Sequence, residues 1–210
     1  MSRNKVTDRV FISLLLAGTL FAGAASYGED QLHDASLSVK SDKTQKQDRN
    51  RTTEQKPNAS VTTTIETKTE ACTLEITVGN STKQNDSYLL EWFFISQKDE
   101  GTSADKLYIF GSGKAVVDLE GKAEITRTEA SKPFIYTKKS IDRVGPGGGS
   151  GNATQTRGGD AYAGYIVLVK ANGQILQKES NNARFLTDEW LAKCESAAKV
   201  SPPVKKKKQP

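Results

Sequence analysis

Residues 72–78 read Cys-Thr-Leu-Glu-Ile-Thr-Val, and residues 88–97 read Tyr-Leu-Leu-Glu-Trp-Phe-Phe-Ile-Ser-Gln. The first stretch alternates apolar and polar side chains, which is the period of a strand with one buried face. The second stretch is apolar on nearly both faces, so it predicts a central strand whose second face another element covers. Together they predict a fold built on β-strands.

Strand patterns and turn signals continue along the chain from these two stretches. We expect further strands at 106–110, 114–119, 122–128, 134–138, 161–170 and 174–179, with Gly111-Ser112-Gly113 and Glu120-Gly121 as turns. Asn172-Gly173 is a strong hairpin signal. Seven or eight short strands predict a mainly β fold, an antiparallel immunoglobulin-like or fibronectin-like β-sandwich over residues 61–198. An open barrel is the alternative.

The pattern changes to helical spacing at residues 183–196. Leu186, Trp190 and Cys194 fall at i, i+4 and i+8, and Asn182 or Thr187 is suited to cap the start. We therefore expect a short C-terminal helix that packs on the sheet.

Residues 1–26 are typical of a secretory signal peptide. Arg3, Lys5 and Arg9 form a positive segment, an apolar run covers 10–22, and small residues at 22–26 suit cleavage. The apolar run is shorter than the roughly 20 residues that span a bilayer. We expect an exported protein that is located in the periplasm, on the cell surface or in the medium.

Two polar segments flank the predicted domain. Residues 27–60 hold almost no large apolar side chains and predict a flexible linker, and residues 199–210 predict a disordered basic tail. The signal carries +2 and Lys205–Lys208 carry +4, so the chain total of +5 leaves −1 for residues 27–204. A near-neutral domain does not favour nucleic-acid binding.

Cys72 and Cys194 are the two cysteines of the chain. An even pair in an exported protein favours a disulfide, and no CxxC motif indicates a redox or zinc site. We predict a Cys72–Cys194 disulfide that joins the first strong strand to the C-terminal helix.

Candidate catalytic and metal-binding residues are few. His33 is the one histidine and lies in the predicted linker, so we expect it to be solvated and predict no metal and no cofactor. Glu91 is interpreted as a strand residue paired with a Lys or Arg. The glycine-rich stretch 145–151 lacks the Lys-Ser/Thr ending of a phosphate loop and is interpreted as a flexible connection.

Three surfaces are candidates for binding. Leu89, Phe93 and Ile95 share one face of the predicted central strand and form a possible partner surface, unless the C-terminal helix covers them. Lys205, Lys206, Lys207 and Lys208 form a possible site for an anionic surface. Five tyrosines are candidates for stacking on sugars: Tyr88, Tyr108, Tyr136, Tyr162 and Tyr165.

Four stretches between residues 72 and 170 resemble a family of secreted bacterial proteins of the Verrucomicrobia type with one immunoglobulin-like or fibronectin-like domain. The resemblance rests on residues 73–80, 90–94, 107–113 and 164–169 and spans about half of the chain. It extends to type IV pilus-associated Ig-like proteins of Akkermansia. It implies a sandwich fold and a surface or pilus-accessory role, and it transfers no site residues.

These observations predict an exported, non-enzymatic Ig-like domain in cell-surface or pilus-associated assembly or adhesion. Its expected partners are proteins of the cell envelope or pilus, with glycan as a further candidate. Membrane contact is expected only through the signal peptide or the basic tail. One alternative is a carbohydrate-binding module that uses exposed tyrosines and the loop at 145–159. A small hydrolase with paired carboxylates is the least favoured alternative.

Overall fold

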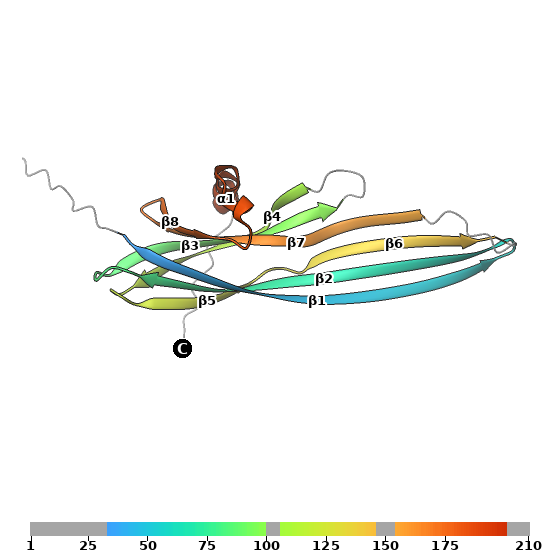
Figure 1. Cartoon of the computed structure of the whole chain (residues 1–210), viewed down its shortest axis with the longest axis horizontal. Coiled ribbons are helices and arrows are strands. Elements are labelled where there is room, and N and C mark those ends of the chain that lie inside the picture. Colours follow the sequence, from blue (N-terminus) through green and yellow to red (C-terminus); the bar gives the residue numbers. More distant parts are fainter. Residues whose placement is uncertain (1–32, 100–105, 146–153, 201–210) are drawn as a thin grey trace, which may run out of the picture. The chain divides into compact units, whose positions relative to one another are not determined.

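Eight antiparallel strands and one α-helix make up the part of the chain that the computed structural model describes, residues 33–99, 106–145 and 154–200 (Figure 1). The elements are β1 (Ala35–Lys56), β2 (Ala59–Asn80), β3 (Asp86–Asp99), β4 (Lys106–Leu119), β5 (Glu124–Ala130), β6 (Phe134–Val144), β7 (Thr154–Ala171), β8 (Gln174–Glu179), the 3-10 turn η1 (Ala183–Leu186) and α1 (Asp188–Val200). The prediction of a mainly β, antiparallel fold with a C-terminal helix is confirmed.

Two long strands change partners along their length. The sheet order is β1-β2-β6-β7-β3-β4, with β5 beside β2 and β8 beside β7. Residues 60–70 of β2 pair with β6, whereas residues 73–79 pair with β5. Residues 154–159 of β7 pair with β6, and residues 159–170 pair with β3. Because β2 and β7 each continue past β6, β1-β2-β5 and β8-β7-β3-β4 lie on opposite sides of a shared core.

The main core fills the space between these two groups of strands. Its buried members on β2 are Leu74, Ile76 and Val78, the alternate residues that the sequence pattern marked. They pack with residues of β3, β4 and β7 that include Leu90, Trp92, Phe94, Val117, Val167 and Val169. The period-two pattern therefore identified the buried face correctly.

A second, smaller core lies between the opposite face of β3 and β7 and the C-terminal helix. Phe93, Ile95 and Phe185 are fully buried there, and Trp190 packs with them. This confirms that β3 is a central strand covered on its second face. It also corrects the predicted partner surface: the helix covers Phe93 and Ile95, and Leu89 is half-buried.

Residues 35–56 form β1 and not a flexible linker. Every residue of β1 pairs with β2, from Ala35 opposite Asn80 to Lys56 opposite Ala59. The prediction was wrong because it rested only on the lack of large apolar side chains in this segment. An edge strand needs a hydrogen-bonding neighbour, and residues 41–56 leave their side chains exposed while β2 supplies the backbone partners.

The Gly111-Ser112-Gly113 stretch is part of β4 and not a turn. Gly113 lies opposite Trp92 in the β3–β4 pairing. A Cβ atom at Gly113 would lie 2.3 Å from Cζ2 of Trp92. Glycine within a strand often marks such a close approach, so the indole ring, and not chain reversal, explains this residue.

The predicted hairpin at Asn172-Gly173 and the helix at 183–196 are confirmed in outline. Asn172 (φ 49°) and Gly173 (φ 80°) both have left-handed backbone angles, as a tight turn between β7 and β8 requires. The helical segment is divided: Asn182 caps η1 by accepting a hydrogen bond from the Arg184 N–H, and α1 begins after Thr187. No helix among the described residues is long and apolar enough to cross a membrane.

We use the name "the arm" for the four-stranded part of the sheet beyond the main core. It comprises residues 41–56 of β1, residues 59–70 of β2, residues 135–144 of β6, and residues 154–159 of β7. Within the described residues, β1 ends the sheet order and pairs with β2 alone. Only near its start does β1 meet β8, where the Val39 N–H donates to the Glu179 carboxylate. The outer edge of β1 along the arm is therefore free in the described structure.

Candidate functional site

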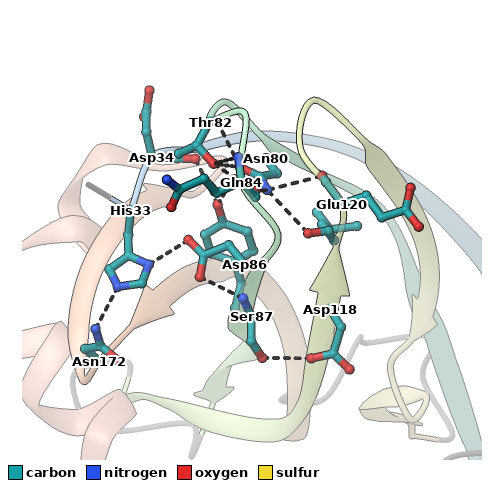
Figure 2. A network of polar contacts seen from close by, with 12 residues as sticks. His33, Asp34, Asn80, Thr82, Gln84, Asp86, Ser87, Asp118, Glu120 and Asn172 are labelled. Carbon is teal, nitrogen blue, oxygen red and sulfur yellow. Dashed lines mark hydrogen bonds and ion pairs between the residues drawn. The ribbon is translucent and has the colours of Figure 1, made fainter. Parts of the chain in front are cut away.

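His33 lies in a network of polar contacts that joins the start of β1 to β3 and to the β7–β8 turn (Figure 2). Its Nδ1 is 2.6 Å from Oδ2 of Asp86, and its Nε2 is 2.7 Å from Nδ2 of Asn172. The imidazole side chain is 16% exposed. His33 is therefore a connecting residue of the fold, and the prediction that it is solvated is wrong.

The contacts of His33 fix its chemistry. A neutral ring with its proton on Nδ1 donates to Asp86 and accepts from the Asn172 amide through Nε2. In a Ser-His-Asp arrangement, the nitrogen remote from the carboxylate takes the proton of the nucleophile. Here Asn172 occupies that nitrogen, and Ser87 Oγ donates to Asp118 at 2.8 Å. The arrangement orders three segments of chain and does not activate a serine.

A buried asparagine completes this end of the fold. Asn80 Oδ1 accepts from Thr82 N–H (2.9 Å) and from the Tyr88 hydroxyl (3.0 Å), and Nδ2 donates to the Gln84 carbonyl (2.7 Å). Burial and the nearby Asp86 carboxylate raise the pKa of Tyr88 to about 12. Burial also acts on Asp86, but its bonds with His33 and the Ser87 N–H prevail and lower its pKa.

A second polar cluster lies where the arm meets the main core. Glu70 is buried, with Lys43 Nζ and Lys68 Nζ at 2.7 and 2.8 Å from Oε1. Its Oε2 accepts from the Tyr162 N–H at 3.2 Å. Burial raises the pKa of Glu70, yet the two lysines and the backbone bond outweigh it, so the pKa lies below the ordinary value. This carboxylate is held ionised and is not a proton donor.

Glu91 forms a buried ion pair, as the sequence predicted. Its Oε2 lies 2.9 Å from Nζ of Lys170, and the two side chains are 5% and 10% exposed. Glu91 Oε2 has no hydrogen-bond partner among the described residues, so the contact is a charge pair. Glu91 shares its face of β3 with Phe93 and Ile95, so the ion pair lies beside the second core.

The predicted disulfide is not formed. Cys72 and Cys194 are free thiols, and each is buried in a different core. Cys72 belongs to the main core and lies 3.4 Å from the Tyr162 hydroxyl, whereas Cys194 lies beneath α1 on the opposite face of β3 and β7. Burial raises the pKa of Cys72 and raises that of Cys194 to about 12. Such thiols are unreactive parts of a core.

The tyrosines proposed for sugar stacking are engaged within the fold. Tyr88 and Tyr165 are buried. The Tyr108 hydroxyl donates to Asp160 at 2.6 Å, and the ring of Tyr162 packs edge-on against Phe134 at 5.4 Å. Tyr136 is half-buried on β6. The signal residues 1–26, the glycine-rich residues 146–151 and Lys205–Lys208 lie outside the described residues, and so do residues 27–32 of the predicted linker.

The side of the arm that continues the core face of β2 is rich in cations. Directly opposed residues of paired strands share a side of the sheet, so the register places Arg49, Glu66, Lys138 and Arg157 in one row across β1, β2, β6 and β7. Arg51 stands in the next row, opposite Thr64. We use the name "the basic row" for the four residues of the first row together with Arg51, which stands next to it.

The basic row was missed by sequence reasoning because its members come from four strands. Within β1, Arg49 and Arg51 are two residues apart and so fall on one side of a strand. This spacing is visible in the sequence, but it indicates a shared side only in a strand, and the segment was interpreted as a linker. Among the described residues, no group of three His, Cys, Asp or Glu side chains is placed to hold a metal ion.

Comparison with known proteins gives no family. No family model matches the chain, and no curated protein matches it. One structural neighbour is an X-ray structure of a Northeast Structural Genomics Consortium target, at 14% identity and a TM-score of 0.23, covering 61% of this chain and 84% of that one. Another is a crystal structure from Akkermansia muciniphila, at 10% identity and a TM-score of 0.20, covering 72% and 74%. At these TM-scores neither neighbour carries an argument about fold or function.

Proposed function

We propose that this protein is an exported, non-enzymatic module of the cell surface that acts in assembly or adhesion, including pilus-associated assembly. In this proposal residues 1–26 direct export, and the packed strands form an immunoglobulin-like or fibronectin-like scaffold. The observation that carries the proposal is the arm. A scaffold with two cores supports a polar edge strand, β1, whose residues 41–56 have a free outer edge in the described structure.

A free edge strand is suited to binding another chain. Its unpaired N–H and C=O groups accept a further strand, and main-chain hydrogen bonds then supply much of the affinity. Residues 41–56 of β1 carry both Lys and Arg and both Asp and Glu side chains, which discourage unselective pairing with hydrophobic strands. A long, polar edge therefore favours a selected protein partner over aggregation.

The polar clusters support a non-enzymatic role. His33 is bound at both ring nitrogens, and Glu70 and Glu91 form ion pairs with lysines. The raised pKa values of both thiols disfavour nucleophilic chemistry. Each of these groups has a structural task that a reaction would disrupt.

Site-specific photo-crosslinking in the native host tests the proposal. A photoreactive amino acid replaces Asn50 on β1 in the full chain, and the matched control replaces Glu195, which is exposed on α1. We expect covalent adducts with envelope proteins from position 50 and not from position 195. Equal labelling from both positions, or no adduct from β1, contradicts the assembly role. Turnover of a defined substrate by the purified protein contradicts the non-enzymatic role.

A further inference from the structure

The two sides of the arm differ in charge. The side that continues the core face carries Lys43, Arg49, Arg51, Lys68, Lys138 and Arg157 against Glu66, Glu70 and Asp142. The outward side carries Lys46, Lys56, Lys139 and Arg143 against Asp42, Asp48 and Glu54. The excess of positive charge therefore lies on the first side.

Within that side, the charges are unevenly neutralised. Lys43 and Lys68 are taken up by the buried Glu70. Glu66 makes one ion pair, with Arg49 at 3.4 Å, and the Arg49 side chain remains 65% exposed. Arg51 and Arg157 are exposed, and Arg157 donates to the uncharged Gln155 at 3.2 Å. The row of Arg49, Lys138 and Arg157 thus contains one carboxylate, Glu66, whose ion pair is with Arg49.

The spacing of the basic row suits an extended anionic chain. Neighbouring strands lie about 4.8 Å apart, so a row across four strands spans about 14 Å. Arginine binds carboxylate and sulfate groups through paired N–H donors, which fixes the direction of approach. In the adjacent row, Thr64 opposite Arg51 is buried, whereas Ser140 is half-buried and Gln155 is exposed. The Ser140 hydroxyl and the Gln155 amide are neutral groups that can bond the hydroxyls of a sugar.

We propose that the basic row binds an acidic polysaccharide, a linear glycan with carboxylate or sulfate groups. A single-stranded nucleic acid would need aromatic platforms for its bases, and the one aromatic side chain in the rows from Arg51 to Lys68 is the half-buried Tyr136. This site stands apart from strand pairing at the edge of β1. Either one can fail while the other holds, because the two are read by different measurements.

The test is binding of the full chain to immobilised heparin and polygalacturonate, with dextran as the neutral glycan. All proteins carry the substitutions Lys205→Gln, Lys206→Gln, Lys207→Gln and Lys208→Gln, so that the four lysines of the tail do not mask the site. We compare Lys138→Gln/Arg157→Gln with the matched control Lys139→Gln/Arg143→Gln. The control removes the same charge from the same sheet but on its outward side.

We expect binding to at least one acidic glycan and not to dextran, with a dissociation constant that rises with salt. Lys138→Gln/Arg157→Gln should weaken binding at least about fivefold, whereas the control should stay within about twofold. Equal effects of the two variants, or no binding to either acidic glycan, would overturn the proposal. So would tighter binding to single-stranded DNA or to phosphatidylglycerol vesicles with the same sensitivity to the variants, because the row would then serve another ligand.

Discussion

The buried pair of Glu91 and Lys170 allows a quantitative prediction. Both side chains are at most 10% exposed, and their charged atoms are 2.9 Å apart. Removing one charge leaves the other buried without its partner, which typically costs about 3–5 kcal/mol. Domains of this kind are stable by about 5–15 kcal/mol in total, so Glu91→Gln should remove a large part of the stability.

The double replacement Glu91→Leu/Lys170→Met should behave differently. It removes both charges and fills the space with apolar side chains of similar size beside the second core. Buried ion pairs replaced in this way often leave stability unchanged or increase it by about 1–4 kcal/mol. The double variant should therefore be much more stable than Glu91→Gln alone.

Urea unfolding at pH 7 measures both effects. Trp92 and Trp190 are buried, one in each core, so their fluorescence reports unfolding of the two cores. With a slope near 2 kcal/mol/M, a loss of 4 kcal/mol lowers the midpoint by about 2 M. The matched control is Glu75→Gln, which breaks the exposed Lys40–Glu75 pair at 3.3 Å and should cost no more than about 1 kcal/mol.

Two results would refute this reasoning. If Glu91→Gln costs no more than Glu75→Gln, the buried pair is screened as well as the exposed one, and its burial has no energetic consequence. If the double variant loses as much as Glu91→Gln, the loss comes from altered packing and not from an unpaired charge.

Three further predictions concern other parts of the fold. The folded-state pKa values of Glu70 and Asp86 lie below their ordinary values of 4.5 and 3.8. The stability that these carboxylates contribute is therefore present above the ordinary values and is lost as the pH falls through the lowered ones. The urea midpoint should fall between pH 7 and pH 3, and Glu70→Gln should reduce this fall. Cys72 and Cys194 should resist iodoacetamide at pH 8 in the folded protein and both react in urea without reductant, whereas failure to react in urea would indicate a disulfide. Gly113→Ala should lower the free energy of unfolding in urea by about 1–3 kcal/mol because the new Cβ meets the Trp92 ring. The control Gly111→Ala should lower it less, because the space around that Cβ is open. Equal losses would assign the effect to strand propensity.

The sequence was most informative where side-chain burial alone determines structure. Alternation at 72–78 and the two apolar faces of 88–97 predicted a half-buried strand and a covered central strand, and both are present. Asn172-Gly173 specified its turn because few residues tolerate two successive left-handed conformations.

Sequence reasoning failed where a residue's role depends on a distant partner. Nothing near Gly113 reveals that Trp92 will lie against it, and nothing near His33 reveals Asp86 or Asn172. Cys72 and Cys194 have the count of a disulfide, but pairing depends on the side of the sheet that each faces, and the intervening strands separate them. The basic row also appears only when four strands are placed in register.

The position of α1 along the chain has a consequence for biosynthesis. Phe93, Ile95, Ile166 and Leu168 are fully buried in the second core, yet Trp190 and Cys194, which cover them, follow all eight strands in the sequence. While the chain emerges in order, these four side chains remain exposed until the helix is complete. Truncation before residue 188 would leave this apolar face of the sheet without the cover of α1. We therefore expect the nascent chain to be most prone to aggregation just before α1 has formed, because the apolar face is exposed until then.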